Sequence, residues 1–264
     1  MLYKMARVIS ITNQKGGVGK TTTSINLAAC LVRRDKRILL IDMDPQGNST
    51  VGCGIDANDV ESTIYDLLLL ETTARQATIK TECGVDLITA NGDLAGAQVE
   101  LLNEIGRELR LQKALIPIQD DYDYIFIDCP PALNVLTINA LVASDSVMIP
   151  MQCEYFALEG LSALISTVRK IRETLNPSLK IEGLLRTMFD GRNSLSNEVS
   201  KQLQTHFGDK VYKTVIPRNV RLAEAPSYGE PVITYSPTSK GARAYLALAD
   251  EILELGDINL AVTA

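Results

Sequence analysis

The sequence predicts an α/β protein, a single doubly wound domain over residues 1–264 in which a mostly parallel sheet carries helices on both faces. Three observations predict it: short apolar runs recur along the chain, helical patterns separate most of them, and the runs are apolar on both faces. Such strands are typical of a covered parallel sheet, whose crossovers are right-handed. The length of 264 residues, with 46% hydrophobic and 22% charged residues, suits one large globular domain.

The predicted strands are runs of five to seven residues that are rich in β-branched and apolar side chains. The first covers 6–12 and leads into a glycine-rich segment at 13–19, and the second covers 37–42 and ends in an aspartate. The later strands are expected at 85–89, 124–128, 146–150, 181–187 and 211–216.

The predicted helices follow from apolar residues that recur at helical spacing. The first covers 20–34, directly after the glycine-rich segment. The other helices are expected at 100–116, 135–143, 158–175, 195–207 and 239–255. Between the last strand and the last helix, four of the ten prolines fall within 217–237. That clustering predicts a long ordered loop, and such loops are often functional.

Membrane insertion and secretion are not expected. The longest apolar runs are a handful of residues, whereas a membrane-spanning helix needs roughly 20. The first apolar stretch, 8–11, is too short for a signal peptide and runs into the glycine-rich segment. We therefore expect a soluble cytoplasmic protein.

The cysteines and the single histidine argue against several classes of enzyme. Five cysteines lie more than twenty residues apart without a CxxC pair, which predicts isolated buried thiols in a reducing compartment. A Ser-His-Asp enzyme or a histidine-ligated metal would depend on His206, which stands in a polar helical stretch without an acidic neighbour pattern. Neither is expected.

Charge is distributed unevenly along the chain, whose net charge is −6. The segment 169–221 holds eleven basic and five acidic residues, a net +6, so the remainder carries −12. The acidic total argues against a general polyanion binder, while the asymmetry allows a local basic face.

The central motif is a glycine-rich phosphate loop between the first strand and the first helix. It reads Lys15-Gly16-Gly17-Val18-Gly19-Lys20-Thr21-Thr22. Glycines let the backbone turn tightly around phosphate oxygens, and the helix that follows adds the positive end of its dipole. Lys20 is expected to reach the β- and γ-phosphates of a nucleotide, and the Thr21 hydroxyl to ligate Mg²⁺.

The loop departs from the common GxxxxGK[ST] pattern, because Gln14 stands where that pattern begins with glycine. The additional Lys15 beside it is electrostatically odd in a site that already holds Lys20 and a metal ion. Its presence makes sense if Lys15 points across an interface to phosphates that a second copy holds.

Three aspartates follow strands whose ends face the phosphate loop. Asp42 and Asp44 close the second strand, and Asp128 closes the strand at 124–128. Because ligands of such sheets bind at the carboxyl ends of strands, the three carboxylates are expected to converge there. Asp128 is expected to hold Mg²⁺ through a water, Asp44 to orient the attacking water, and Asp42 to support the metal region.

These residues resemble the deviant Walker-A ATPases, the ParA/MinD group of P-loop proteins. The resemblance rests on KGGVGKTT, DMDPQGN and FIDCPPALN, and it covers essentially the whole chain. The stretches LLRTMFDGR at 184–192 and TVIPRNVRLAEAPSYGEP at 214–231 are similar to the chromosomal ParA/Soj branch. The implied fold is that of P-loop NTPases, and the implied cofactors are ATP and Mg²⁺.

The resemblance also implies a mode of action. ATP drives a sandwich homodimer in which Lys15 reaches the partner's nucleotide, the dimer binds double-stranded DNA without sequence preference, and a ParB-type partner stimulates hydrolysis on the nucleoid. Pro217 and Asn219 would line the adenine side.

DNA contacts are expected from the charge count together with this resemblance. Arg192 and Arg221 match positions at which the Soj branch places DNA-contacting arginines, with Lys240 and Arg243 as weaker candidates. Two other basic residues, Arg186 within a strand and Arg218 beside the adenine loop, are expected to be structural or close to the nucleotide.

Three other classes of protein carry the same phosphate loop and are alternatives to a partition ATPase. A MinD-like, membrane-bound regulator needs a basic amphipathic C-terminal helix, but 250–264 holds four acids and no Lys or Arg. An electron-transferring iron protein needs cluster cysteines, and Asn134-Val135-Leu136 stands where its Cys-Gly-Gly segment is expected. A metabolic ligase with its own substrate pocket stays open.

Overall fold

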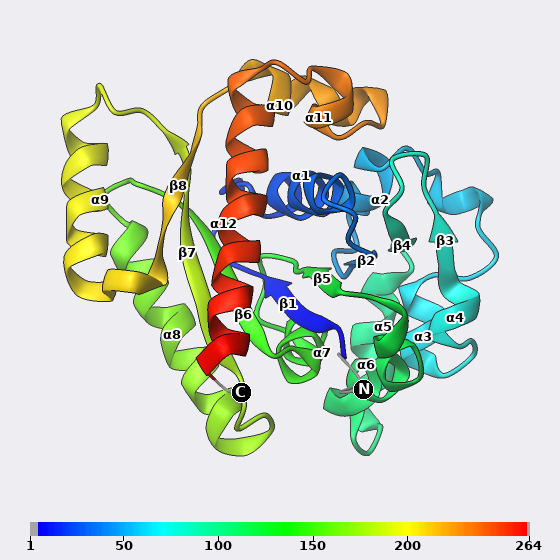
Figure 1. The fold of residues 1–264 in the computed structure, drawn as a ribbon. Helices are drawn as coiled ribbons and strands as arrows, with labels where there is room; N and C mark the ends of the chain where they lie inside the picture. The colour runs from blue at the N-terminus through cyan, green and yellow to red at the C-terminus, as the bar shows by residue number, and fades with distance from the viewer. Residues whose placement is uncertain (1–4, 263–264) are drawn as a thin grey trace.

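One eight-stranded sheet runs through the computed structural model, which describes residues 5–262, and helices lie on both of its faces (Figure 1). The strands are β1 (Arg7–Ile11), β2 (Ile38–Asp42), β3 (Thr78–Lys80), β4 (Asp86–Ile88), β5 (Tyr124–Asp128), β6 (Ser146–Gln152), β7 (Lys180–Phe189) and β8 (Val211–Pro217). Their order across the sheet is β3-β4-β2-β5-β1-β6-β7-β8, and only β3 and β4 pair antiparallel. The predicted fold class, a mostly parallel α/β sheet, is confirmed.

The two ends of the predicted domain 1–264 lie outside the described residues. These are residues 1–4, 263 and 264, together with the side chains of 257–262, so the acidic residue at 257 is part of that undescribed set. No helix within the described range is both long and apolar enough to cross a bilayer.

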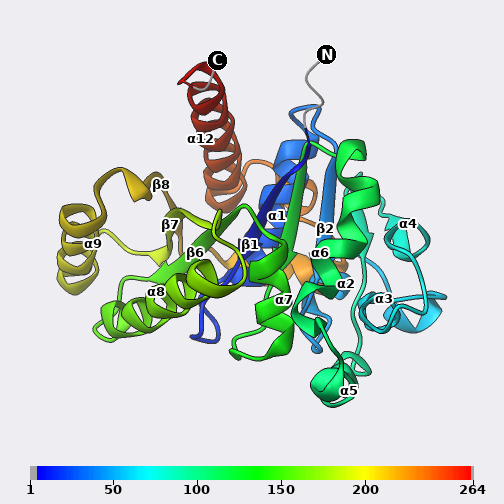
Figure 2. The same ribbon diagram turned by 90° about the horizontal axis from the view of Figure 1, so that it is seen from below.

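The helices form two layers. They are α1 (Lys20–Val32), α2 (Asn48–Gly52), α3 (Ile64–Leu69), α4 (Ala74–Ala77), α5 (Leu94–Glu100), α6 (Arg110–Leu115), α7 (Val135–Ala143), α8 (Ala157–Thr174), α9 (Ser194–Phe207), α10 (Val220–Glu224), α11 (Val232–Tyr235) and α12 (Lys240–Val262). Helices α1 and α12 lie against one face of the sheet, and α6, α7 and α8 lie against the other (Figure 2).

Both faces of the central strands are buried, which explains their continuous apolar sequence. Ile9 and Phe126 pack with α1 and α12, whereas their sequence neighbours Val8 and Ile125 pack with α3, α6 and α7. Side chains alternate between the faces of a strand, so a sheet that is covered on both sides requires apolar residues at every position.

The predicted helix at 100–116 is wrong. Gly106 has a φ of 70°, in the left-handed region that glycine adopts without steric cost, and the chain turns there. The segment consists of short 3₁₀ turns at Leu101–Asn103 and Arg107–Leu109, followed by α6. The antiparallel edge strand β3 was not predicted, since three residues are too few to show a period.

The proline-rich stretch 217–237 is ordered, as expected, but it is not a plain loop. It contains α10, a 3₁₀ turn at Ala225–Tyr228, and α11. Pro226 stands in the first turn of that 3₁₀ segment and Pro231 directly precedes α11, both positions where a missing N–H costs nothing.

All five cysteines are free thiols, and four of them are buried. The expectation that the thiols are isolated is wrong for Cys53 and Cys83, which lie close enough for each thiol to shift the pKa of the other. Cys53 ends α2, and Cys83 lies in the turn between β3 and β4 that was not predicted. The Cys53 thiol, together with the Thr81 hydroxyl at 3.1 Å from the Cys83 sulfur, lowers the pKa of Cys83 to about 6.

Candidate nucleotide site and basic surface

The phosphate loop joins β1 to α1 and keeps an open, glycine-lined surface. Gly17 and Gly19 have φ values of 70° and 86°, so this backbone path requires glycine. No atom lies within 4 Å of the place where a Cβ of Gly16 or Gly17 would stand. No side chain caps the N-terminus of α1. The first N–H groups of α1 are therefore available for an anion.

Lys20 begins α1 and is nearly buried, with 7% of its surface exposed. Its Nζ donates a hydrogen bond to the carbonyl oxygen of Lys15 at 3.1 Å. Burial lowers the pKa of Lys20, and the nearby carboxylates of Asp128 and Asp44 oppose that effect. The ammonium group thus lies inside the loop, close to both predicted carboxylates.

Asp128 is fully buried at the end of β5, and three hydroxyl groups donate to it. Its Oδ2 accepts from Thr21 Oγ1 at 2.8 Å and from Ser49 Oγ at 2.7 Å, and its Oδ1 accepts from Ser24 Oγ at 3.0 Å. Burial raises the pKa of Asp128, and these hydrogen bonds counteract the rise. The hydroxyl and carboxylate expected to hold Mg²⁺ are therefore in direct contact.

Asp42 lies beside Asp128, because the two residues are paired in register on β2 and β5. Asp42 Oδ2 accepts from the N–H and the hydroxyl of Thr50, both at 2.9 Å, and Oδ1 accepts from the N–H of Asp44 at 3.1 Å. Burial and the charge of Asp128 raise the pKa of Asp42. The short helix α2, which carries Ser49 and Thr50, is thereby bonded to both acids.

Asp44 is half-buried just beyond β2, and its Oδ1 accepts from the N–H of Gln46 at 3.0 Å. Its carboxylate lies near enough to Lys20 to stabilise the ammonium charge. Asp128 and Asp44 therefore lie near Lys20 of the phosphate loop, and Asp42 lies next to Asp128, in agreement with the strand-end rule.

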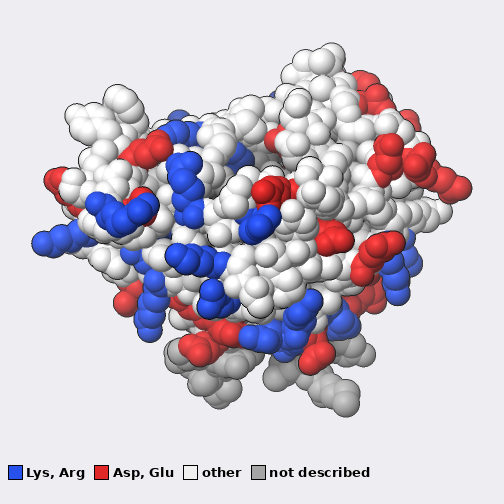
Figure 3. All heavy atoms as spheres, turned by 90° about the horizontal axis from the view of Figure 1, so that it is seen from above, with Lys and Arg blue, Asp and Glu red and all other residues white. Residues whose placement is uncertain are grey.

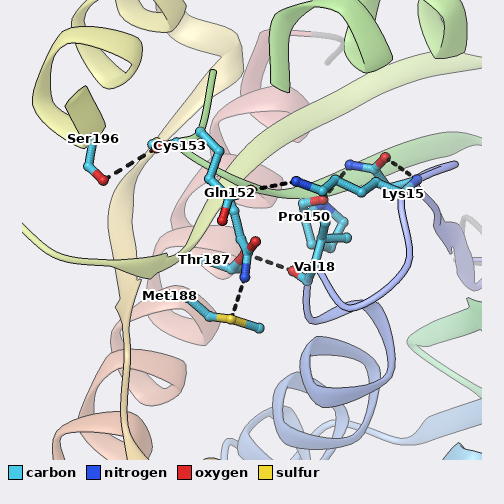
Figure 4. A network of polar contacts seen from close by, with 10 residues as sticks. Lys15, Val18, Pro150, Gln152, Cys153, Thr187, Met188 and Ser196 are labelled. Atoms are coloured by element: carbon cyan, nitrogen blue, oxygen red, sulfur yellow. Dashed lines mark hydrogen bonds and ion pairs between the residues drawn. The ribbon is translucent and has the colours of Figure 1, made fainter. Parts of the chain in front are cut away.

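The loop is also supported from β6 and β7, which sequence reasoning missed (Figure 4). Thr187 Oγ1 donates to the carbonyl oxygen of Val18 at 2.7 Å. Asn13 Nδ2 donates to the carbonyl oxygen of Pro150 at 2.8 Å, and Asn13 Oδ1 accepts from the N–H of Lys15 at 3.0 Å. These supports come from more than 130 positions away in the chain, so no local pattern could reveal them.

Lys15 is the exposed lysine of the loop, with 44% of its side chain exposed. Its Nζ forms an ion pair with Glu154 Oε2 at 2.5 Å, beyond the end of β6. Its side chain thus points toward an exposed segment, while its main-chain carbonyl holds Lys20.

The basic surface lies on the side of α9, β7 and β8, where Lys and Arg gather on the upper face (Figure 3). Arg192 stands in the loop between β7 and α9, with 91% of its side chain exposed. It donates two hydrogen bonds to Asp190, from Nε at 3.0 Å and from Nη2 at 2.9 Å. This ion pair lowers the pKa of Asp190 to about 2.

The other DNA candidates are exposed as well. Arg221, on α10, donates to Glu224 at 2.7 Å and keeps half of its side chain exposed. Lys240 and Arg243 are exposed on the first turn of α12. Each of these cations could reach a phosphate backbone without disturbing the core.

Arg186 and Arg218 differ from each other. Arg186 is 5% exposed and donates to Ser200 Oγ and to the carbonyl oxygens of Tyr212 and Lys213, so it is structural, as expected. Arg218 is exposed and near enough to Asp190 to lower its pKa further, and its expected position close to the nucleotide stays a prediction. β7 and β8 are parallel neighbours, and their ends bring Arg218 beside the loop of Arg192.

The two residues expected near adenine both lie at the carboxyl end of β8. Pro217 is its last residue. Asn219 caps α10, and its Oδ1 accepts from the N–H of Arg221 at 3.2 Å. The loop of Pro217 and Asn219 is therefore fixed in place by its own capping contact.

Comparison with known proteins gives consistent matches. The AAA domain family matches residues 6–181, more than half of the chain. The sporulation initiation inhibitor protein Soj of Bacillus subtilis is 56% identical, with 96% of this chain and all of that protein covered. The chromosome partitioning protein ParA of Caulobacter vibrioides is 52% identical, with 94% of each chain covered.

A solved structure shares the fold over the same extent. It is a cobyrinic acid a,c-diamide synthase from Mycobacterium smegmatis with a bound ATP analogue and magnesium. It superposes with a TM-score of 0.83 at 37% identity, and 94% of each chain is covered. The phosphate loop of this chain, its buried lysine and its paired acids stand within that shared fold, and relatives above 50% identity extend over nearly the whole chain. The chain therefore belongs to the ParA/Soj family of P-loop ATPases.

Proposed function

We propose that this protein is a DNA-partitioning ATPase that hydrolyses ATP slowly, binds DNA non-specifically as an ATP-bound dimer, and is stimulated by a ParB-type centromere-binding protein. The observation that carries the proposal is the pair of lysines in one loop. Lys20 is buried against Asp128 and Asp44, whereas Lys15 is exposed and directed away from them.

The residues around the loop fit ATP with Mg²⁺. Gly16, Gly17 and the uncapped start of α1 form an open cradle that suits phosphate oxygens. Thr21 and Asp128 would hold the ion, since a hard cation prefers hydroxyl and carboxylate oxygens. When bound there, Mg²⁺ would neutralise part of the negative charge of the phosphates.

Within this site each side chain has a separate task. Lys20 would leave the carbonyl of Lys15 and bind the β- and γ-phosphates. Asp44 would orient the attacking water, and Asp42, which accepts from the N–H and the hydroxyl of Thr50, would support the metal region. Asp44→Ala should therefore still bind ATP, lose hydrolysis and accumulate as a dimer, because the phosphate cradle is intact.

The exposed position of Lys15 favours a contact in trans. Lys15→Ala should bind ATP as a monomer and lose the partner-stimulated part of hydrolysis. Light scattering with ATP, beside a stimulated ATPase assay, checks both parts. A dimeric and fully active Lys15→Ala protein would contradict the trans role.

DNA binding is assigned to the exposed arginines Arg192 and Arg221, with Lys240 and Arg243 as further contacts. A two-fold dimer doubles the phosphate contacts of one chain, so binding should require ATP. Each lost phosphate contact should reduce the slope of log affinity against log salt by about 0.9. A salt titration of the Asp44→Ala dimer, with and without Arg192→Ala and Arg221→Ala, tests this. Equal affinity and slope in all three proteins would place the DNA surface elsewhere.

In the cell, the proposal implies a cytoplasmic protein that associates with the nucleoid and leaves DNA when its ATP is hydrolysed. The test is an ATPase assay with DNA and a ParB-type protein, added singly and together. Stimulation by both supports a partition ATPase, and a turnover that neither changes would contradict it.

A metabolic ligase is the second candidate, because the similar solved structure is named as a diamide synthase. That activity would require a carboxylate substrate and an amide product rather than DNA. The same ATPase assay separates these candidates.

A further inference from the structure

Lys15 and Glu154 meet because their strands are neighbours. β1 and β6 pair in parallel, with Ile11 opposite Met148, so the segments after the two strands leave the same edge of the sheet. The Lys15 ammonium and the Glu154 carboxylate lie 2.5 Å apart, with 44% and 51% of the two side chains exposed.

Hydrogen bonds hold the main chain of both residues of this ion pair in place. The N–H of Lys15 donates to Asn13 Oδ1, and Asn13 Nδ2 donates to the carbonyl oxygen of Pro150 at the end of β6. On the other side, the carbonyl oxygen of Glu154 accepts from the N–H of Ala157 at the start of α8. The fold therefore places the main chain of the two residues so that their charged groups can meet.

The surface next to Glu154 is apolar and exposed. Tyr155 and Phe156 are 74% and 68% exposed, and their rings pack edge to face with centroids 5.0 Å apart. Exposed aromatic residues of this size are typical of a surface that a partner covers. A second copy that approached the phosphate loop would meet the ion pair beside this surface.

The Glu154 carboxylate also competes with the role assigned to Lys15. While Glu154 Oε2 lies 2.5 Å from the Lys15 Nζ, its negative charge repels the phosphate oxygens of a partner and offsets the positive charge that Lys15 would offer them. We propose that Glu154 is a positioning residue, which retains Lys15 in the single chain and must release it when the ATP-bound dimer forms. This inference rests on the proposed trans role of Lys15.

Glu154→Gln should strengthen the ATP-dependent dimer. A symmetric dimer breaks two such ion pairs, each of the strength typical of exposed pairs, so the dissociation constant should fall by about fivefold. The measurement is sedimentation or light scattering over a concentration series, with Mg-ATP and in the Asp44→Ala background so that ATP persists. Since the pair is exposed, the difference should shrink as salt rises.

Two further variants separate the charge of Glu154 from its surroundings. Glu154→Asp retains a carboxylate and should dimerise more like the parent than Glu154→Gln does. Glu159→Gln removes an exposed carboxylate from the first turn of α8 and should leave the dissociation constant unchanged. All three variants should bind ADP as the parent does, because none of them alters the phosphate loop.

A second readout does not depend on the dimer. Without nucleotide, acylation of Lys15 by an amine-reactive ester, followed by mass spectrometry, should be several-fold faster in Glu154→Gln, because no carboxylate covers the ammonium. An unchanged or weaker dimer in Glu154→Gln, or an unchanged acylation rate, overturns the inference. If the Asp44→Ala parent itself stays monomeric with ATP, the proposed dimer is wrong, and the trans role of Lys15 fails with it.

Discussion

Ser49→Ala should destabilise the protein although it removes a single oxygen atom. Ser49 Oγ donates to Asp128 Oδ2 at 2.7 Å, and both residues are fully buried. A hydrogen bond to an ionised group contributes about 1.5–3 kcal/mol. Water cannot replace the lost donor at a buried position, so we expect a loss of about 2 kcal/mol in the free energy of unfolding.

The assay is thermal unfolding without nucleotide or Mg²⁺, so that only contacts within the chain count. For a domain of this size, a loss of about 2 kcal/mol corresponds to a fall in Tm of roughly 4–8 °C. Ser162→Ala is the matched control, because Ser162 is exposed on α8 and its hydroxyl donates only to a carbonyl of its own helix. If both variants melted within about 1 °C of the parent, the Ser49 contact would be without consequence.

Three other variants test separate parts of the account. Lys20→Ala should abolish Mg-ADP binding in calorimetry, whereas Lys113→Ala, an exposed change on α6, should bind normally. Arg186→Met leaves two carbonyl oxygens of β8 without their donor and should cost about 2–4 kcal/mol in urea unfolding, so an unchanged midpoint would contradict the structural role. Arg192→Ala should return the pKa of Asp190 from about 2 toward its ordinary range, as followed by NMR titration, and a pKa that stayed low would point to another cation.

The sequence predicts most of the sheet because its strands are buried on both faces and are therefore apolar without interruption. The strand at 124–128 and the helix at 135–143 agree with β5 and α7 residue for residue. The wrong prediction depends on the backbone conformation of a single residue. The helix at 100–116 breaks at Gly106, whose left-handed conformation an apolar pattern does not reveal.

The residues of the candidate site also fall into two groups, those that a pattern in the sequence predicts and those that it does not. Lys20, Thr21 and Asp128 could be predicted, because a local motif and the strand-end rule bring them together. Ser49 could not be predicted, because a serine in a short polar segment carries no periodic signal. Glu154 lies 139 positions from Lys15, and only the pairing of β1 with β6 joins them.

The position of Arg218 follows from the pairing of β7 with β8. Phe189 and Pro217 pair across β7 and β8, so the loops that follow these two strands must be neighbours. The same strand-end reasoning that placed the aspartates would have put Arg218 beside Arg192. Arg218 therefore joins Arg192 as a candidate contact on the basic surface.

The most direct test of the proposed function is the affinity of the Asp44→Ala protein for two unrelated DNA duplexes, measured by fluorescence anisotropy with Mg-ATP and with Mg-ADP at one salt concentration. We expect the Asp44→Ala protein to bind DNA with ATP only and to bind the two sequences with equal affinity. Equal binding with ADP, or a strong preference for one duplex, would contradict it.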